Sequence, residues 1–101
     1  MGRHVAVVGP GDIAAQARTV MENLVVALRA SGAELSDVAK STVYVASSRR
    51  EDLVAAWDVV RAAFGDHDAP STLIGVSVLG YPDQLVEVEA VAVLPVTSAP
   101  R

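Results

Sequence analysis

The chain has 101 residues and a mass of 10.5 kDa, which is the size of one domain. Hydrophobic residues make up 51% of it and charged residues 20%, a composition that excludes an intrinsically disordered protein. Aromatic residues are only 4%, whereas the chain holds 19 valines and 17 alanines, so its core must be thin. We therefore expect one domain over residues 1–94 with a flexible tail over 95–101, and an oligomer that buries further surface.

The charge of the chain limits its partners. Its formal net charge is −4, and its largest basic cluster is Arg49-Arg50, so nucleic acid is not an expected partner. It has no cysteine, which excludes disulfides and a thiolate nucleophile. No apolar run reaches the length of a secretory signal or a membrane helix. These observations predict a cytoplasmic protein without a membrane partner.

The first half of the chain predicts a strand, a helix and a second strand. A Val-rich run over His4–Val8 stops at a Gly-Pro-Gly turn. Asp12 is a good N-cap for a helix that extends to Ser31, with apolar residues spaced by three and four. Gly32 ends this helix, and the residues from Lys40 to Ala46 have the composition of a strand.

The second half predicts another helix and two more strands. Leu53, Trp57, Val60 and Phe64 form one apolar stripe, which Gly65 ends. Residues 71–79 and 84–94 are rich in β-formers and are joined by Gly-Tyr-Pro-Asp, so we expect them to pair as an antiparallel hairpin. The order is β-α-β-α-β-β. The predicted fold class is α/β, a two-layer α+β sandwich with helices on one face of a mixed sheet.

The last predicted strand alternates strictly between two faces. Val86, Val88, Ala90, Ala92 and Leu94 share one face, which we expect to lie under the helices. The other face carries Leu85, Glu87, Glu89, Val91 and Val93, and the neighbouring strand adds Thr42 and Tyr44 to it. This mixed face is too apolar for water and too charged for a core. It is therefore the predicted subunit interface.

Five residues on or near these strands are candidate site residues. A carboxylate of Glu87 or Glu89 in a half-apolar cleft could act as a general base, or it could pair with an arginine across the interface or face solvent. Ser71 and Thr72 could donate hydrogen bonds to a ligand, or they could simply close a loop. Tyr44 could line a cleft or contact another subunit.

Two other patterns are of the kind that can bind a metal or a cofactor. His67 lies between Asp66 and Asp68, but His4 is the only other histidine, so the ligand count predicts no metal site. Gly9, Gly11 and Ala14 match the dinucleotide fingerprint G-x-G-x-x-A between a strand and a helix. The chain is too short for a dinucleotide fold, the predicted hairpin interrupts the parallel pattern, and Asp12 would repel a pyrophosphate. We expect no cofactor.

Long segments of the chain resemble the Rid/YjgF family of small trimeric proteins. The resemblance rests on the order and spacing of residues in three runs: GDIAAQARTVMENLVVALRASGAELSDVAKSTVYV, FGDHDAPSTLIGVSVLG and LVEVEAVAV. It covers roughly Gly9 to Leu94. It implies a chorismate-mutase-like α/β fold, a homotrimer built on the sheet faces, and clefts between subunits that bind a small metabolite.

The resemblance also implies which chemistry this chain retains. In family members that hydrolyse enamines and imines, an arginine grips the substrate carboxylate and a glutamate in the last strand holds the attacking water. Glu87 matches that glutamate, whereas Ser71 stands at the arginine's position. Val8 and Trp57 replace a serine and an asparagine of the family site, and an N-terminal tyrosine has no counterpart.

These departures predict a trimer that binds a small metabolite without efficient imine deaminase activity. One alternative is a working deaminase in which Arg49 or Arg50 replaces the missing arginine. Another is a structural or protein-binding trimer that has no small-molecule ligand.

Overall fold

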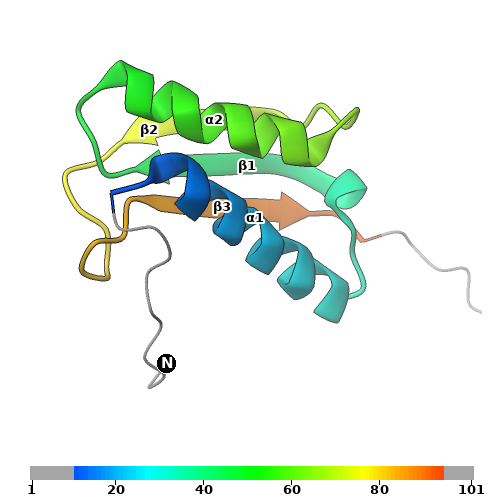
Figure 1. Ribbon diagram of the computed structural model, residues 1–101. Helices are drawn as coiled ribbons and strands as arrows, with labels where there is room; N and C mark the ends of the chain where they lie inside the picture. The colour runs from blue at the N-terminus through cyan, green and yellow to red at the C-terminus, as the bar shows by residue number, and fades with distance from the viewer. Residues whose placement is uncertain (1–10, 95–101) are drawn as a thin grey trace, which may run out of the picture.

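The computed structural model describes residues 11–94, which form two layers, one of helices and one of β-sheet (Figure 1). The helices are α1 (Ile13–Ala30) and α2 (Arg50–Phe64), and a short 3₁₀ helix, η1 (Leu35–Asp37), precedes the first strand. The strands are β1 (Val38–Val45), β2 (Ser71–Gly75) and β3 (Val86–Ala92). The strand predicted over His4–Val8 and the tail predicted over 95–101 lie outside the described residues.

Helix α1 begins and ends where its sequence predicts. The Asp12 carboxylate accepts a hydrogen bond from the Ala15 backbone N–H at 2.9 Å and so caps the N-terminus. At the other end Gly32 has a φ of +86°, and the Ala33 N–H donates to the Leu28 carbonyl at 2.8 Å. This is the Schellman arrangement, which ends the helix at a glycine because glycine adopts positive φ without strain.

The sheet is mixed, and its central strand is β1. Strand β2 pairs with β1 in parallel, with Val43 opposite Leu73. Strand β3 pairs with the other edge of β1 in antiparallel orientation, with Val43 opposite Val88.

The predicted hairpin between residues 71–79 and 84–94 is therefore wrong. Helix α2 carries the chain from β1 to β2 as a crossover, which makes those two strands parallel. Residues 76–85 then carry the chain past the end of β1 to its far edge, so β2 and β3 never meet. The fold class itself, two helices on one face of a mixed sheet, is confirmed.

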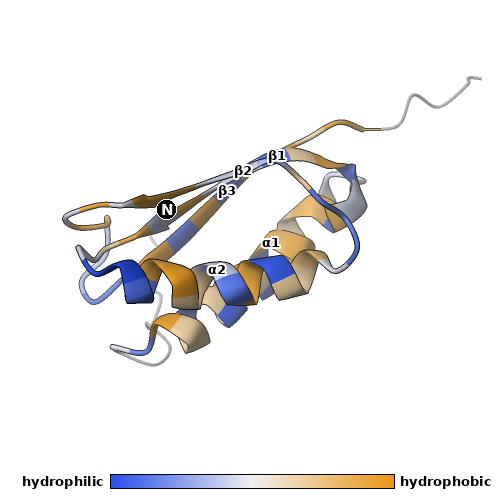
Figure 2. Cartoon of the chain, turned by 90° about the horizontal axis from the view of Figure 1, so that it is seen from above, coloured by the Kyte–Doolittle hydropathy of each residue, from blue (hydrophilic) through white to orange (hydrophobic). Residues whose placement is uncertain are grey.

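The core lies between the helices and one face of the sheet, as the view along the layers shows (Figure 2). Its largest fully buried side chains are all valines: Val43, Val45, Val60 and Val86. The predicted stripes supply Met21, Leu28 and Phe64, with Trp57 packed against them. Because these side chains are mostly small, the core is thin. No described helix is long and apolar enough to cross a membrane.

Candidate functional site

The uncovered face of the sheet brings together most of the predicted site residues. The strand register aligns them in two rows across β2, β1 and β3. One row holds Thr72, Thr42 and Glu89, and the next holds Ile74, Tyr44 and Glu87. Within residues 11–94 no helix or strand lies over this face (Figure 2). The alternation in the sequence therefore predicted correctly that Tyr44, Glu87 and Glu89 share a face.

A hydrogen bond joins the two rows. The Tyr44 hydroxyl donates to Oε1 of Glu89 at 2.8 Å, along the diagonal between neighbouring rows. This hydrogen bond raises the pKa of Tyr44 above its ordinary value of 10.0. Desolvation and the negative charges of Glu89 and Glu87 raise the pKa further. Tyr44 therefore stays protonated in neutral solution, and its only hydroxyl hydrogen is directed to Glu89.

Glu87 is the half-buried carboxylate of this face, whereas Glu89 is exposed. Tyr44 on β1 lies directly opposite Glu87. Within the described residues Glu87 makes no hydrogen bond and no ion pair, so its two oxygens remain available as acceptors. Its predicted role as a general base stays a prediction.

Ser71 and Thr72 lie on opposite sides of β2. Thr72 lies on the uncovered face opposite Thr42. The Ser71 hydroxyl contacts the buried Ser41 hydroxyl at 2.5 Å and donates to the Ala69 carbonyl at 3.0 Å. The structure thus brings Thr72 to Tyr44 and the two glutamates but turns the Ser71 hydroxyl toward the helical side.

A hollow of about 270 Å³ lies between α1 and β3, beside Glu87. Its lining residues come from one stripe of α1, from the segment just before β3 and from the start of β3: Val20, Asn23, Leu24, Ala27, Gln84, Val86, Glu87 and Val88. Sequence reasoning missed two amides of this lining: Asn23, because the α1 stripe predicts only core residues, and Gln84, because it falls at the start of a predicted strand. The spacing of Asn23 from Val20 along α1 was the available signal for Asn23.

Gln16 fixes the chain where β3 begins. Its Nε2 donates to the Asp83 carbonyl at 3.0 Å, and its Oε1 accepts from the Leu85 N–H at 2.8 Å. Leu85 precedes β3, is half-buried and packs against the core rather than lying on the mixed face as predicted. Sequence reasoning missed Gln16, since a lone glutamine in an apolar stripe carries no signal of what it contacts.

The structure also places the remaining candidates, His67, Arg49 and Arg50. Nε2 of His67 lies 2.7 Å from the Val38 carbonyl, which gives this histidine a structural role. Arg49 forms an exposed ion pair with Glu51 at 3.3 Å, and Arg50 is the first residue of α2. Among residues 11–94 no group of three or more His, Asp or Glu side chains could hold a metal ion.

The topology also disagrees with a dinucleotide site. Strand β3 is antiparallel to β1, whereas dinucleotide folds use a parallel sheet. The N-terminus of α1 is already occupied by the Asp12 carboxylate. The fold instead places the chain in the class of small two-layer α/β domains with two helices on one face of a mixed sheet.

Comparison with known proteins identifies the family within that class. Residues 2–94 match the family model described as Endoribonuclease L-PSP. A RutC family protein of Pyrococcus horikoshii is 38% identical over 82 residues, which are 81% of this chain and 63% of that protein. The chain thus spans less than two-thirds of the length of this relative.

Solved structures agree in fold. The Rid family protein YyfB of Yersinia pestis has a TM-score of 0.79 and 36% identity, covering 86% of this chain and 66% of that one. The YjgF gene product of E. coli has a TM-score of 0.72 and 31% identity, covering 83% and 66%. The chain belongs to the YjgF/Rid family.

Proposed function

We propose that this protein is a homotrimer that binds a small metabolite in clefts formed by its uncovered sheet faces and that it lacks efficient imine deaminase activity. The observation that carries the proposal is that Glu87, Tyr44 and Glu89 lie together on that face. The family resemblance adds that Ser71 corresponds to the arginine of the deaminases. A bidentate guanidinium is hard to replace in gripping a carboxylate.

The apolar residues of the uncovered face support assembly. Ile74, Val91 and Val93 are 42%, 52% and 66% exposed, although all three belong to or directly follow strands. Burying such surface stabilises a protein by about 25 cal/mol per Å², and a thin valine core gains from it. Light scattering at low micromolar concentration should give about three times the mass of 10.5 kDa. A stable monomer would overturn the assembly.

The polar groups of the face indicate the charge of the ligand. Glu87 and Glu89 are acceptors, and the hydroxyl hydrogen of Tyr44 is already donated to Glu89. Lys40 is the cation of β1 on this side, but it lies opposite Val91, at the end of the sheet away from Glu87. Such a surface favours a neutral or cationic metabolite over the carboxylate-bearing imines of the deaminases.

The decisive experiment generates 2-iminopropanoate in situ from an amino acid and its oxidase and follows the decay of the imine. A relative that carries the arginine serves as the positive control. We expect this protein to leave the spontaneous rate nearly unchanged. Acceleration close to that of the control would overturn the proposal.

Arg49 and Arg50 define the alternative, a deaminase with a replacement arginine. Arg49 is the N-cap of α2 and Arg50 is its first residue, at the end of the sheet where Val45 pairs with Val86 next to Glu87. If the imine decays faster, Arg49→Ala and Arg50→Ala should be measured separately, and the variant that loses the acceleration identifies the clamp.

Glu87→Gln separates metabolite binding from a purely structural trimer. If Glu87 contacts a ligand, the change should weaken binding of that ligand by about 1.5 to 3 kcal/mol and leave assembly intact. If Glu87 pairs with an arginine across the interface, the same change should loosen the trimer. Variants with unchanged binding and unchanged thermal midpoint would show that Glu87 is merely solvated.

Activity on RNA is not part of this proposal, although the family model carries the name of an endoribonuclease. The chain has a pI of about 4.9, and RNA-binding surfaces gather basic side chains on one face. Two of the arginines in the described part of the chain, Arg29 and Arg49, are already paired with glutamates.

A further inference from the structure

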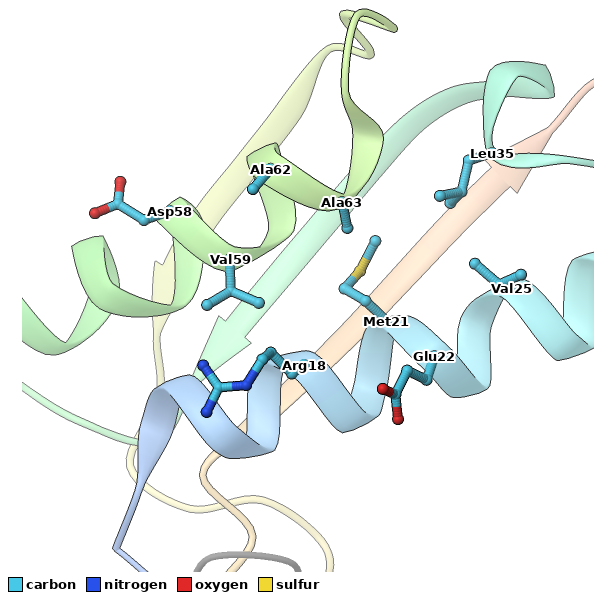
Figure 3. A pocket seen from close by; sticks show the side chains of 9 residues that line it. All are labelled: Arg18, Met21, Glu22, Val25, Leu35, Asp58, Val59, Ala62 and Ala63. Carbon is cyan, nitrogen blue, oxygen red and sulfur yellow. The ribbon is translucent and has the colours of Figure 1, made fainter.

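A second hollow lies on the opposite layer of the molecule, between the outer sides of α1 and α2 (Figure 3). Its volume is about 560 Å³, within the range of about 300–1,000 Å³ typical of small-molecule sites. We call it the helix groove. It is lined by nine residues: Arg18, Met21, Glu22, Val25, Leu35, Asp58, Val59, Ala62 and Ala63.

The floor of the helix groove is apolar. Met21 is 3% exposed and lies at its centre, and Val59 and Ala63 face Met21 from α2. Ala62 and Ala63 are too short to cover the seam between the helices, which keeps the groove open. Val25 has the spacing of a core residue but is only half-buried, because its side chain lines this groove. The groove therefore offers apolar contact surface to a molecule from solvent.

Charges of both signs stand at its rim. Arg18 and Glu22 come from successive turns of α1, and Asp58 comes from α2 (Figure 3). Within the described residues none of the three forms an ion pair or a side-chain hydrogen bond. Arg18 precedes Glu22 by four positions, and this order is the less favourable one for an ion pair along a helix. The guanidinium and both carboxylates are therefore available to a ligand.

We propose that the helix groove binds a zwitterion with an apolar body, either a free apolar amino acid or a short apolar peptide with free ends. A ligand with only one charge would be attracted by one part of this rim and repelled by the other. A ligand with both charges places its carboxylate at Arg18 and its ammonium at Asp58 or Glu22. Its aliphatic body then packs on Met21, away from water.

This site does not depend on the proposed trimer. The helices cover one face of the sheet, and the helix groove lies on their outer side, whereas Tyr44 and Glu87 lie on the uncovered face. Binding in the groove and binding at the uncovered face are separable experimentally, since they involve different residues on opposite layers.

Titration of the ¹⁵N-labelled protein, followed by amide chemical shifts, tests the proposal. The probes are leucine, leucinamide, which keeps only the positive charge, and N-acetyl-leucine, which keeps only the negative one. We expect leucine or Leu-Leu to shift the amides of residues in the groove at concentrations up to about 20 mM, and the two single-charge analogues to bind less tightly. Comparison of leucine with Leu-Leu distinguishes an amino acid from a peptide as the source.

Variants of exposed residues provide the matched controls. Arg18→Gln and Asp58→Asn should each weaken leucine binding about twofold to fivefold, the range of exposed charge pairs. Arg61→Gln, an exposed residue of α2 that does not line the groove, should leave binding unchanged. The proposal is overturned if neither zwitterion shifts the groove amides, or if leucinamide or N-acetyl-leucine binds as tightly as leucine.

Discussion

Gly75→Ala tests how closely the end of β2 packs against the chain after β1. A Cβ at Gly75 would lie 2.6 Å from the carbonyl oxygen of Ser47. An ordinary contact begins at 3.4 Å, so the backbone would have to move by about 0.8 Å. Overpacking of this kind costs about 1–3 kcal/mol. For a domain of this size the thermal midpoint should fall by on the order of 10 °C.

Gly80→Ala is the matched control, because a Cβ there would meet nothing within 4 Å and the backbone of Gly80 does not have positive φ. This variant should change stability by less than about 0.5 kcal/mol or slightly increase it. Both variants are compared with the parent by urea unfolding at one protein concentration, because assembly makes stability concentration-dependent. Equal midpoints for Gly75→Ala and the parent would refute the close approach of the two backbones.

Three further changes test other contacts. Gln16→Leu should lower the free energy of unfolding by about 1–3 kcal/mol, since the Leu85 N–H and the Asp83 carbonyl lose their partner. Gln16→Glu should have an intermediate effect because it keeps only the acceptor, and urea unfolding measures both variants. Asp12→Ala removes the cap of α1 and should cost about 1 kcal/mol, whereas Asp12→Asn should cost less; the same assay decides. Because the pKa of Tyr44 is raised in the folded state, the protonated tyrosine stabilises that state below pH 10.0. This contribution disappears as the pH rises through the raised pKa of Tyr44. Thermal midpoints between about pH 9 and pH 11 should therefore fall more steeply in the parent than in Tyr44→Phe, and parallel curves would contradict the assignment.

The helices were predictable because their ends are encoded locally. Asp12 and Gly32 act on neighbouring backbone groups, so a few adjacent residues decide where α1 begins and ends. Gly65 does the same for α2 with a φ of +64°. The inward face of β3 was equally predictable, because alternation along one strand needs no knowledge of its partners.

The partners of the strands could not be predicted in this way. Residues 71–79 and 84–94 have the same β-forming composition and a turn-like connection, which is all that a hairpin needs locally. Their actual arrangement depends on α2, which returns the chain parallel to β1, and on Gln16, which holds Asp83 and Leu85 at the far edge. Both features depend on residues far apart in the sequence. An analysis of neighbouring residues alone therefore favours the hairpin, which is the shorter connection.

The candidate site was predicted at the level of faces rather than contacts. Alternation placed Tyr44, Glu87 and Glu89 together, but the diagonal bond from Tyr44 to Glu89 depends on the register between β1 and β3. The helix groove was missed for a similar reason. Its hollow exists because Ala62 and Ala63 of α2 face Met21 of α1, and neither helix alone shows that pairing.

If position 71 corresponds to the family's arginine, as the resemblance implies, serine there provides neither the charge nor the length of that side chain. Strand β2 is an edge of the described sheet, so a long side chain at position 71 could extend around that edge toward the uncovered face. The Ser71 hydroxyl is instead tied to Ser41 and to the Ala69 carbonyl on the helical side. A cation supplied by Arg49 or Arg50 would have to come from the N-terminal end of α2, and Arg49 is already paired with Glu51. No side chain of β2 therefore neutralises the carboxylates of the uncovered face, which is why the proposed ligand of that face is cationic or neutral rather than anionic.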